Sequence, residues 1–174
     1  MENRQDTGIN LQPSEDGSLN EYAQRGDYHL ERRMARKWLP IYFRRFHLVE
    51  NLLKRFYRKD SIILDVGCGE GELVERLNKD GYTAATGVDP FAGAGSSLVK
   101  KGSILDLPFE DKSIEVVCAL EVLEHIPLNQ QLAAAEQLFR VTRPGGILLV
   151  SVPNMAHLRS RLSMLFRGRP WRNK

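Results

Sequence analysis

Residues 61–77, with the sequence SIILDVGCGEGELVERL, constrain the fold of this chain more than any other stretch. A short apolar run ends at Asp65, and glycines follow at positions 67, 69 and 71 before a helix-like pattern begins. Glycine costs conformational order, and in return it gives only positive φ and space for something to approach the backbone. We therefore expect a buried strand, a tight turn and a helix, with a ligand lying against the turn.

The hydrophobic pattern switches between strand-like and helix-like periods along the chain. Strands are expected at 61–66, 82–89, 96–102, 114–120 and 147–153, and helices at 70–81 and 128–146. An earlier helix should begin at Pro40, with one apolar stripe formed by Ile41, Leu48, Val49, Leu52, Leu53 and Phe56. Strands that alternate with helices pair in parallel through right-handed crossovers. The prediction is an α/β fold: a Rossmann-like, doubly wound parallel sheet with helices on both faces.

Length and composition narrow the class of protein. The 174 residues suit one domain, and the charged content of 27% is ordinary for a soluble globular protein. No apolar run reaches the roughly 18 to 20 residues that cross a bilayer, and the polar N-terminus lacks the apolar core of a secretory signal. The widely separated Cys68 and Cys118 favour neither a disulfide scaffold nor a zinc site. We expect a cytoplasmic protein, and the sequence shows no metal cluster.

Positive charge is concentrated in two segments on either side of an acidic middle. Residues 31–59 carry ten basic and two acidic side chains, and residues 155–174 carry six basic and none acidic. These segments are either solvated helix faces or contacts for an anionic partner, such as a lipid surface, a phosphorylated substrate or RNA. We expect a loosely ordered segment 1–30, a domain 31–154 that begins with N-terminal lid helices, and a basic amphipathic helix at 155–174.

The spacing of the glycines decides between ligands of opposite charge. In doubly wound sheets, ligands bind at the carboxyl ends of the strands, where a carboxylate about 20 residues after a glycine turn can accept hydrogen bonds from a ribose. Asp89 has that position, but the dinucleotide fingerprint G-x-G-x-x-G would need glycine where the chain has Glu72. Asp65 would repel a pyrophosphate and attract a cation. The residues therefore predict a positively charged nucleoside without phosphates, such as a sulfonium or amine-bearing adenosine derivative.

Five segments, in order, resemble the motifs of class I S-adenosylmethionine-dependent methyltransferases. They are DVGCGEG at 65–71, GVDP at 87–90, GSILDLPFEDKSIEVV at 102–117, ALEVLEHI at 119–126 and RVTRPGGILLVSVPN at 140–154. A single glycine motif is weak evidence, whereas five in the right order are strong. The resemblance covers roughly residues 45–154. It implies an enzyme with S-adenosyl-L-methionine as its cofactor and a small-molecule or lipid-like methyl acceptor.

The resemblance also assigns residues to parts of the cofactor. The methionine moiety would be flanked by Asp65, Gly67, Cys68 and Gly69, and the ribose would be bound by Asp89. The adenine would lie beside Pro90 and Phe91, with its edge bracketed by Ser103, Ile104 and Leu105. The cofactor would be closed over, near the sulfonium, by Leu120 and Glu121. Family members often have an acid at the position of Ser103. A serine accepts a weaker hydrogen bond, so we expect a modestly lower cofactor affinity.

Three of the candidate residues also have structural interpretations. Cys68 is expected to be a small side chain that fits the turn rather than a nucleophile. Asp89 could cap the segment that follows it instead of binding a ribose. His125 could be buried and satisfied, or it could be the general base that removes a proton from an oxygen acceptor.

The C-terminal end departs from the family pattern. The family sheet usually adds two strands after the fifth, and the twenty residues from Met155 show no strand pair. The sheet is therefore expected to lack these strands, and its edge would be covered by the C-terminal helix or a partner chain, or be open to self-association. Two other functions remain open. One is a truncated module that binds S-adenosylmethionine without turnover, and the other is a membrane- or nucleic-acid-associated protein that uses segments 31–59 and 155–174.

Overall fold

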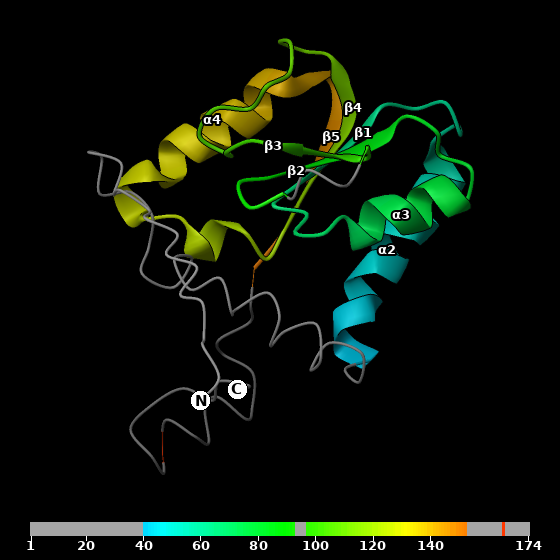
Figure 1. Ribbon diagram of the computed structural model, residues 1–174, viewed down its shortest axis with the longest axis horizontal. Helices are drawn as coiled ribbons and strands as arrows, with labels where there is room; N and C mark the ends of the chain where they lie inside the picture. Colours follow the sequence, from blue (N-terminus) through cyan, green and yellow to red (C-terminus); the bar gives the residue numbers. More distant parts are fainter. Residues whose placement is uncertain (1–39, 93–96, 153–164, 166–174) are drawn as a thin grey trace, which may run out of the picture.

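The computed structural model describes residues 40–92, 97–152 and 165, which are coloured in Figure 1. The helices are α2 (Pro40–Phe56), α3 (Glu72–Lys79) and α4 (Gln131–Val141), and the short 3-10 helices are η1 (Leu123–His125) and η2 (Leu128–Gln130). The strands are β1 (Ile63–Val66), β2 (Ala85–Asp89), β3 (Val99–Lys101), β4 (Ile114–Leu120) and β5 (Thr142–Ser151). The predictions for segment 1–30, for lid helices before Pro40 and for a helix at 155–174 lie outside the described residues, except that Leu165 is helical.

The five strands form one parallel sheet in the order β3-β2-β1-β4-β5. The chain runs outward from β1 to β3, returns to place β4 beside β1, and then continues outward to β5. The direction of winding thus reverses between β1 and β4, which is where ligands bind in sheets of this kind. The predicted α/β, doubly wound architecture is confirmed. In the described part of the chain β5 pairs only with β4, so it is an edge strand.

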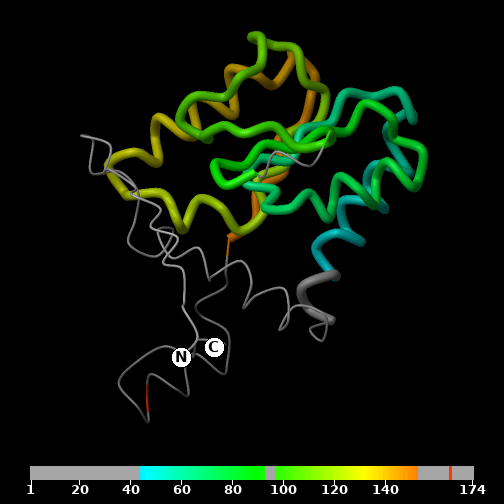
Figure 2. The backbone as a smooth tube through the Cα atoms, viewed as in Figure 1, coloured from blue at the N-terminus to red at the C-terminus, as the bar shows by residue number. Residues whose placement is uncertain are grey.

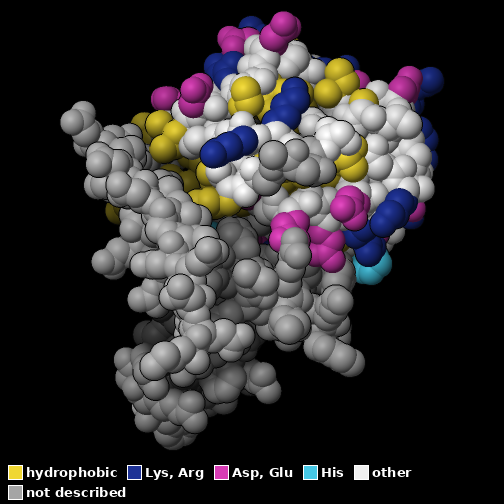
Figure 3. Space-filling model, in the orientation of Figure 1, with side chains coloured by type: hydrophobic (Ala, Val, Ile, Leu, Met, Phe, Trp, Pro, Cys, Tyr) yellow, Lys and Arg dark blue, Asp and Glu magenta, His cyan; other side chains and the backbone are white. Residues whose placement is uncertain are grey.

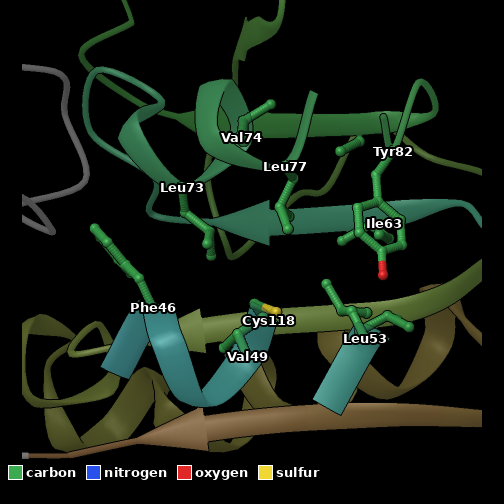
Figure 4. Close-up of a cluster of buried hydrophobic side chains, with 11 residues drawn as sticks. Phe46, Val49, Leu53, Ile63, Leu73, Val74, Leu77, Tyr82 and Cys118 are labelled. Carbon is green, nitrogen blue, oxygen red and sulfur yellow. The ribbon is translucent and has the colours of Figure 1, made fainter. Parts of the chain in front are cut away.

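Helices cover the sheet on both faces, with α2 and α3 on one side and α4 on the other (Figure 2). Figure 4 shows the hydrophobic cluster between the sheet and helices α2 and α3, in which Leu53 of α2 and Leu77 of α3 approach Ile63 of β1. On the opposite face Leu138 of α4 packs in a cluster with Leu64 of β1. Full burial of one such side chain stabilises the fold by about 1.5–3 kcal/mol. The two clusters therefore fix the position of β1 and of the turn that follows it.

The apolar stripe predicted for α2 is partly wrong. The helix does begin at Pro40, and Val49 and Leu53 are buried. Leu48 and Phe56, however, are 66% and 67% exposed, and Phe46 is buried instead. Phe46, Val49 and Leu53 follow the spacing of three and four that one face of a helix requires, and Leu48 lies behind that face.

The boundary between α4 and β5 also differs from the prediction. The helix ends at Val141 rather than continuing to residue 146, and β5 begins at Thr142. The stretch with Pro144 and two glycines lies inside the strand, where the register against β4 shifts between Ile114 and Val116. Proline and glycine are tolerated at such irregularities on an edge strand because the ladder is already interrupted there.

Candidate functional site

The turn after β1 is built on backbone hydrogen bonds to β2. The N–H groups of Gly67 and Cys68 donate to the Val88 carbonyl at 2.8 and 3.2 Å, and the Gly69 N–H donates to Oδ2 of Asp89 at 2.8 Å. Helix α3 begins directly afterwards, so its first N–H groups lie beside the turn. The sequence prediction of a strand, a tight turn and a helix is confirmed.

The glycines of this turn are needed for different reasons. A Cβ atom on Gly67 would lie 2.6 Å from Cγ2 of Val122, whereas a Cβ atom on Gly69 would have nothing within 4 Å. Both residues have positive φ, 69° and 59°. At Gly67 a side chain is therefore excluded by the protein itself. Gly69 faces open space, which matches the expectation that a ligand approaches the backbone here.

Asp65 is a buried carboxylate at the carboxyl end of β1, only 5% exposed. Among the described residues, no hydrogen bond or ion pair reaches its side chain. Its pKa is raised to about 7, chiefly because burial disfavours the charged form; the Arg45 guanidinium partly opposes this rise and the nearby Asp89 adds to it. An ionised Asp65 would therefore be stabilised by a cationic group placed beside it.

Asp89, at the end of β2, is 6% exposed and uses both carboxylate oxygens. Oδ2 accepts from the Gly69 N–H, and Oδ1 accepts from the Phe91 N–H, each at 2.8 Å. The capping interpretation is thus correct, since Asp89 caps the segment after it. It also ties that segment to the glycine turn. Carboxylate oxygens have further lone pairs, so a ribose contact remains compatible with these bonds and stays a prediction. Pro90 and Phe91 are both exposed beside it.

The segment after β3 holds the three residues predicted at the adenine edge. The Ser103 hydroxyl accepts a hydrogen bond from the Leu105 N–H at 3.1 Å. Ile104 is 6% exposed and belongs to the cluster on the α4 face, so its side chain is part of the hydrophobic core. Leu105 is half-buried. Contacts of this segment with adenine stay a prediction, with Ser103 already partly engaged.

Arg140, which sequence reasoning missed, fixes the loop that follows this segment. From α4 it donates to the carbonyls of Leu107 at 2.8 Å and Phe109 at 2.9 Å, and to the Asp111 carboxylate at 2.7 Å. Hydrogen bonds of a guanidinium to three acceptors are strong and directional. Arg140 is one of two charged residues, with Glu136, in an Ala- and Leu-rich helix, and this pattern does not indicate what it binds.

Glu121 follows β4 with a strained backbone, since its φ of 58° lies in the left-handed region. Three hydrogen bonds with Ser151, at the end of β5, support this conformation. The Glu121 N–H donates to the carbonyl and the hydroxyl of Ser151, and the hydroxyl donates to Oε1 of Glu121 at 2.9 Å. Ser151 was not predicted, although a polar residue that ends an apolar strand could have indicated it. Glu121 and the preceding Leu120 are both half-buried.

Cys68 and His125 differ in how far the structure decides their roles. Burial raises the pKa of the Cys68 thiol, and Asp65 and Asp89 raise it further, so the thiol stays protonated and the packing interpretation is favoured. His125 lies in η1, with its Nε2 atom 3.8 Å from Oε1 of Glu124 and its side chain 39% exposed. A general-base role for it stays a prediction. In the described ranges no three His, Cys, Asp or Glu side chains are grouped to hold a metal ion.

Comparison with known proteins gives consistent relatives. A family described as a methyltransferase domain matches residues 30–172. A protein of Mycolicibacterium smegmatis named "Probable S-adenosylmethionine-dependent methyltransferase" is 35% identical over 121 residues, which are 65% of this chain and 46% of that protein. The chain thus spans about half the length of this relative.

Solved structures share the fold. The PH0226 protein of Pyrococcus horikoshii superposes with a TM-score of 0.58 at 23% identity, over 73% of this chain and 65% of that one. A SAM-dependent methyltransferase of Thermotoga maritima gives a TM-score of 0.52 at 18% identity, over 79% of this chain and 67% of that one. At these identities the likeness concerns the architecture alone.

None of the helices within the described ranges is long and apolar enough to span a membrane.

Proposed function

Because this chain belongs to the class I S-adenosylmethionine-dependent methyltransferases, we propose that the carboxyl ends of β1, β2 and β4 bind S-adenosylmethionine and direct its methyl group to an acceptor. One observation carries the proposal: the buried carboxylates of Asp65 and Asp89 lie at neighbouring strand ends, beside an open space at Gly69. A cation offsets the cost of ionising a buried carboxylate, and a phosphate would increase that cost.

The residues present fit this cofactor. Asp65 has no described hydrogen-bond partner, and its environment favours the ammonium of the methionine moiety. Asp89 would accept from the ribose hydroxyls while it holds the turn through Gly69. Pro90 and Phe91, which are exposed, would provide apolar surface for the adenine ring, and Ser103 would lie at its edge.

When bound, S-adenosylmethionine supplies a methyl group on a sulfonium, whose leaving group departs neutral and needs no acid. The protein has to align the acceptor and keep water away, which is a matter of positioning. Glu121, fixed by Ser151, would border the transferred methyl group beside Leu120. With an oxygen acceptor, His125 would remove the proton from the attacking hydroxyl. A small-molecule or lipid-like acceptor remains our proposal.

Titration calorimetry with the full chain tests the binding step. We expect S-adenosylmethionine and S-adenosylhomocysteine to bind, and NADH, which carries an adenosine and a pyrophosphate, to be rejected. Binding of NADH in place of the other two would refute the electrostatic argument. Turnover is a separate test, in which formation of S-adenosylhomocysteine is followed with hydroxyl- and amine-bearing acceptors in detergent. Binding without any product would leave a module that holds the cofactor only.

A further inference from the structure

Helix α4 exposes large apolar side chains and keeps several polar ones against the protein. Leu132 and Phe139 are 72% and 79% exposed, and Figure 3 shows hydrophobic side chains gathered on the surface where α4 lies. Gln131, Gln137 and Arg140 are instead half-buried, although surface helices usually place their polar side chains in water. Gln137 and Arg140 bond to the backbone of the loop after β3. The inward polar residue of α4 that still needs a role is therefore Gln131.

Gln131 holds the short stretch between β4 and η2, residues 121–126, which contains η1 and which we call the η1 segment. Its Nε2 atom donates to the carbonyls of Leu123 and Ile126, at 3.1 and 3.2 Å. Leu123 begins η1 and Ile126 follows its last residue, so the amide spans the whole turn. A side-chain amide carries two N–H donors, and both are used here. A single 3-10 turn has few hydrogen bonds of its own, so these two bonds contribute much of what fixes its conformation.

The other end of the η1 segment is fixed to the glycine turn and to β5. The Cγ2 atom of Val122 fills the space beside Gly67, since a Cβ atom on that glycine would lie 2.6 Å from it. The Val122 carbonyl accepts from the His125 N–H at 2.9 Å. One residue earlier, Oε1 of Glu121 accepts from the Ser151 hydroxyl. Contacts with the turn, with β5 and with α4 thus determine where the η1 segment lies relative to the turn.

We propose that Gln131 is a positioning residue for methyl transfer. By bonding to both ends of η1, its amide keeps the imidazole of His125 at a fixed place relative to the glycine turn and to the cofactor bound there. Gln131 acts through η1 rather than by touching the reacting groups. This inference rests on the proposed function, to which it adds the residue that sets the geometry of the acceptor side. Methyl transfer depends on alignment, so a displaced η1 would lower its rate even with the cofactor fully bound.

The imidazole of His125 provides a readout that needs no known acceptor. In the full chain with isotope-labelled histidine, its NMR signal is assigned among the four histidines by its loss in His125→Gln. We expect S-adenosylhomocysteine to shift this signal in the unaltered chain. Gln131→Met keeps the length of the side chain and removes both donors. In this variant calorimetry should give an unchanged affinity for S-adenosylhomocysteine, whereas the shift of the His125 signal should fall to about half or less because η1 is displaced.

Three further variants separate the lost hydrogen bonds from other effects of the change. Gln131→Glu keeps the polar shape but replaces the donating nitrogen by an accepting oxygen, so it should reduce the shift as Gln131→Met does. Gln131→Lys restores a donor and should recover the shift. Asn129→Leu removes an exposed amide two residues earlier and should leave the shift unchanged.

The possible failures can be told apart. A full shift in both the Met and the Glu variants, with S-adenosylhomocysteine bound, would overturn this inference and leave the proposed function standing. A His125 signal that ignores the bound ligand in the unaltered chain would have the same consequence. Loss of affinity in step with the shift would assign Gln131 a purely structural role. If the unaltered chain bound no S-adenosylhomocysteine, the proposed function would fail, and this inference with it.

Discussion

Replacing Asp65 by asparagine should stabilise the ligand-free protein at alkaline pH and weaken cofactor binding at the same time. The side chain keeps its shape, but the charge that burial disfavours is removed. Asp65 has its folded pKa raised from 3.8 to about 7. The folded state therefore keeps a proton over this range that the unfolded state releases. The stability that this retained proton contributes is fully present below about pH 4 and is lost as the pH rises through about 7.

The size of the effect follows from the pKa shift. A change from 3.8 to about 7 corresponds to at most about 4 kcal/mol of unfolding free energy at pH 8. Cofactor binding also depends on whether the Asp65 carboxyl is protonated. Asp65 would be about nine-tenths protonated at pH 6 and half protonated at pH 7, so affinity for an ammonium-bearing ligand should rise about fivefold between these values.

Urea unfolding of the Asp65→Asn variant and the unaltered chain at pH 4 and pH 8 measures the first effect. Calorimetry with S-adenosylhomocysteine at pH 6 and pH 7 measures the second. Asp60→Asn is the matched control: Arg58 bonds to Asp60 and lowers its pKa, so any change there has the opposite sign. Equal stability of the Asp65 variant and the unaltered chain at pH 8, or a pH-dependent affinity that persists in the variant, would refute the reasoning.

Four further substitutions separate folding from binding. Gly69→Ala should weaken cofactor binding and cost about 1–2 kcal/mol of stability, because its φ is positive. Gly67→Ala should destabilise the fold further, because its Cβ atom would clash with Val122. Urea unfolding and calorimetry together distinguish the two variants. Asp89→Ala should reduce stability by about 1–3 kcal/mol through two lost backbone hydrogen bonds and should weaken S-adenosylhomocysteine binding; an unchanged affinity would remove Asp89 from the ribose. Ser151→Ala should lower kcat with a known acceptor and leave cofactor affinity nearly unchanged, and the reverse pattern would argue against a role for Glu121 near the methyl group.

The glycine turn could be predicted because its requirements are local. Three glycines between a carboxylate and a helical pattern leave few backbone conformations, and the structure has the predicted strand, turn and helix around Asp65. The reason for each glycine could not be predicted, since it depends on what lies opposite. Val122, far along the chain, excludes a side chain at Gly67, and only Gly69 faces open space.

The parts that the sequence left undetermined depend on contacts between distant elements. The exposed Leu48 looks like a core residue until the face of α2 that meets the sheet is known. Ser151 and Arg140 act on groups about thirty positions away in the chain, so no local pattern indicates them. Ile104 satisfied the family motif, yet its side chain belongs to the hydrophobic core.

The hydrogen bonds from Arg140 to the loop after β3 also affect how the sequence of this loop can diverge. Two of its hydrogen bonds end on main-chain carbonyls, those of Leu107 and Phe109, which every amino acid supplies. Side chains in the loop can therefore be exchanged over evolutionary time while its path is preserved. A lineage could alter what that rim recognises without rebuilding the scaffold beneath it.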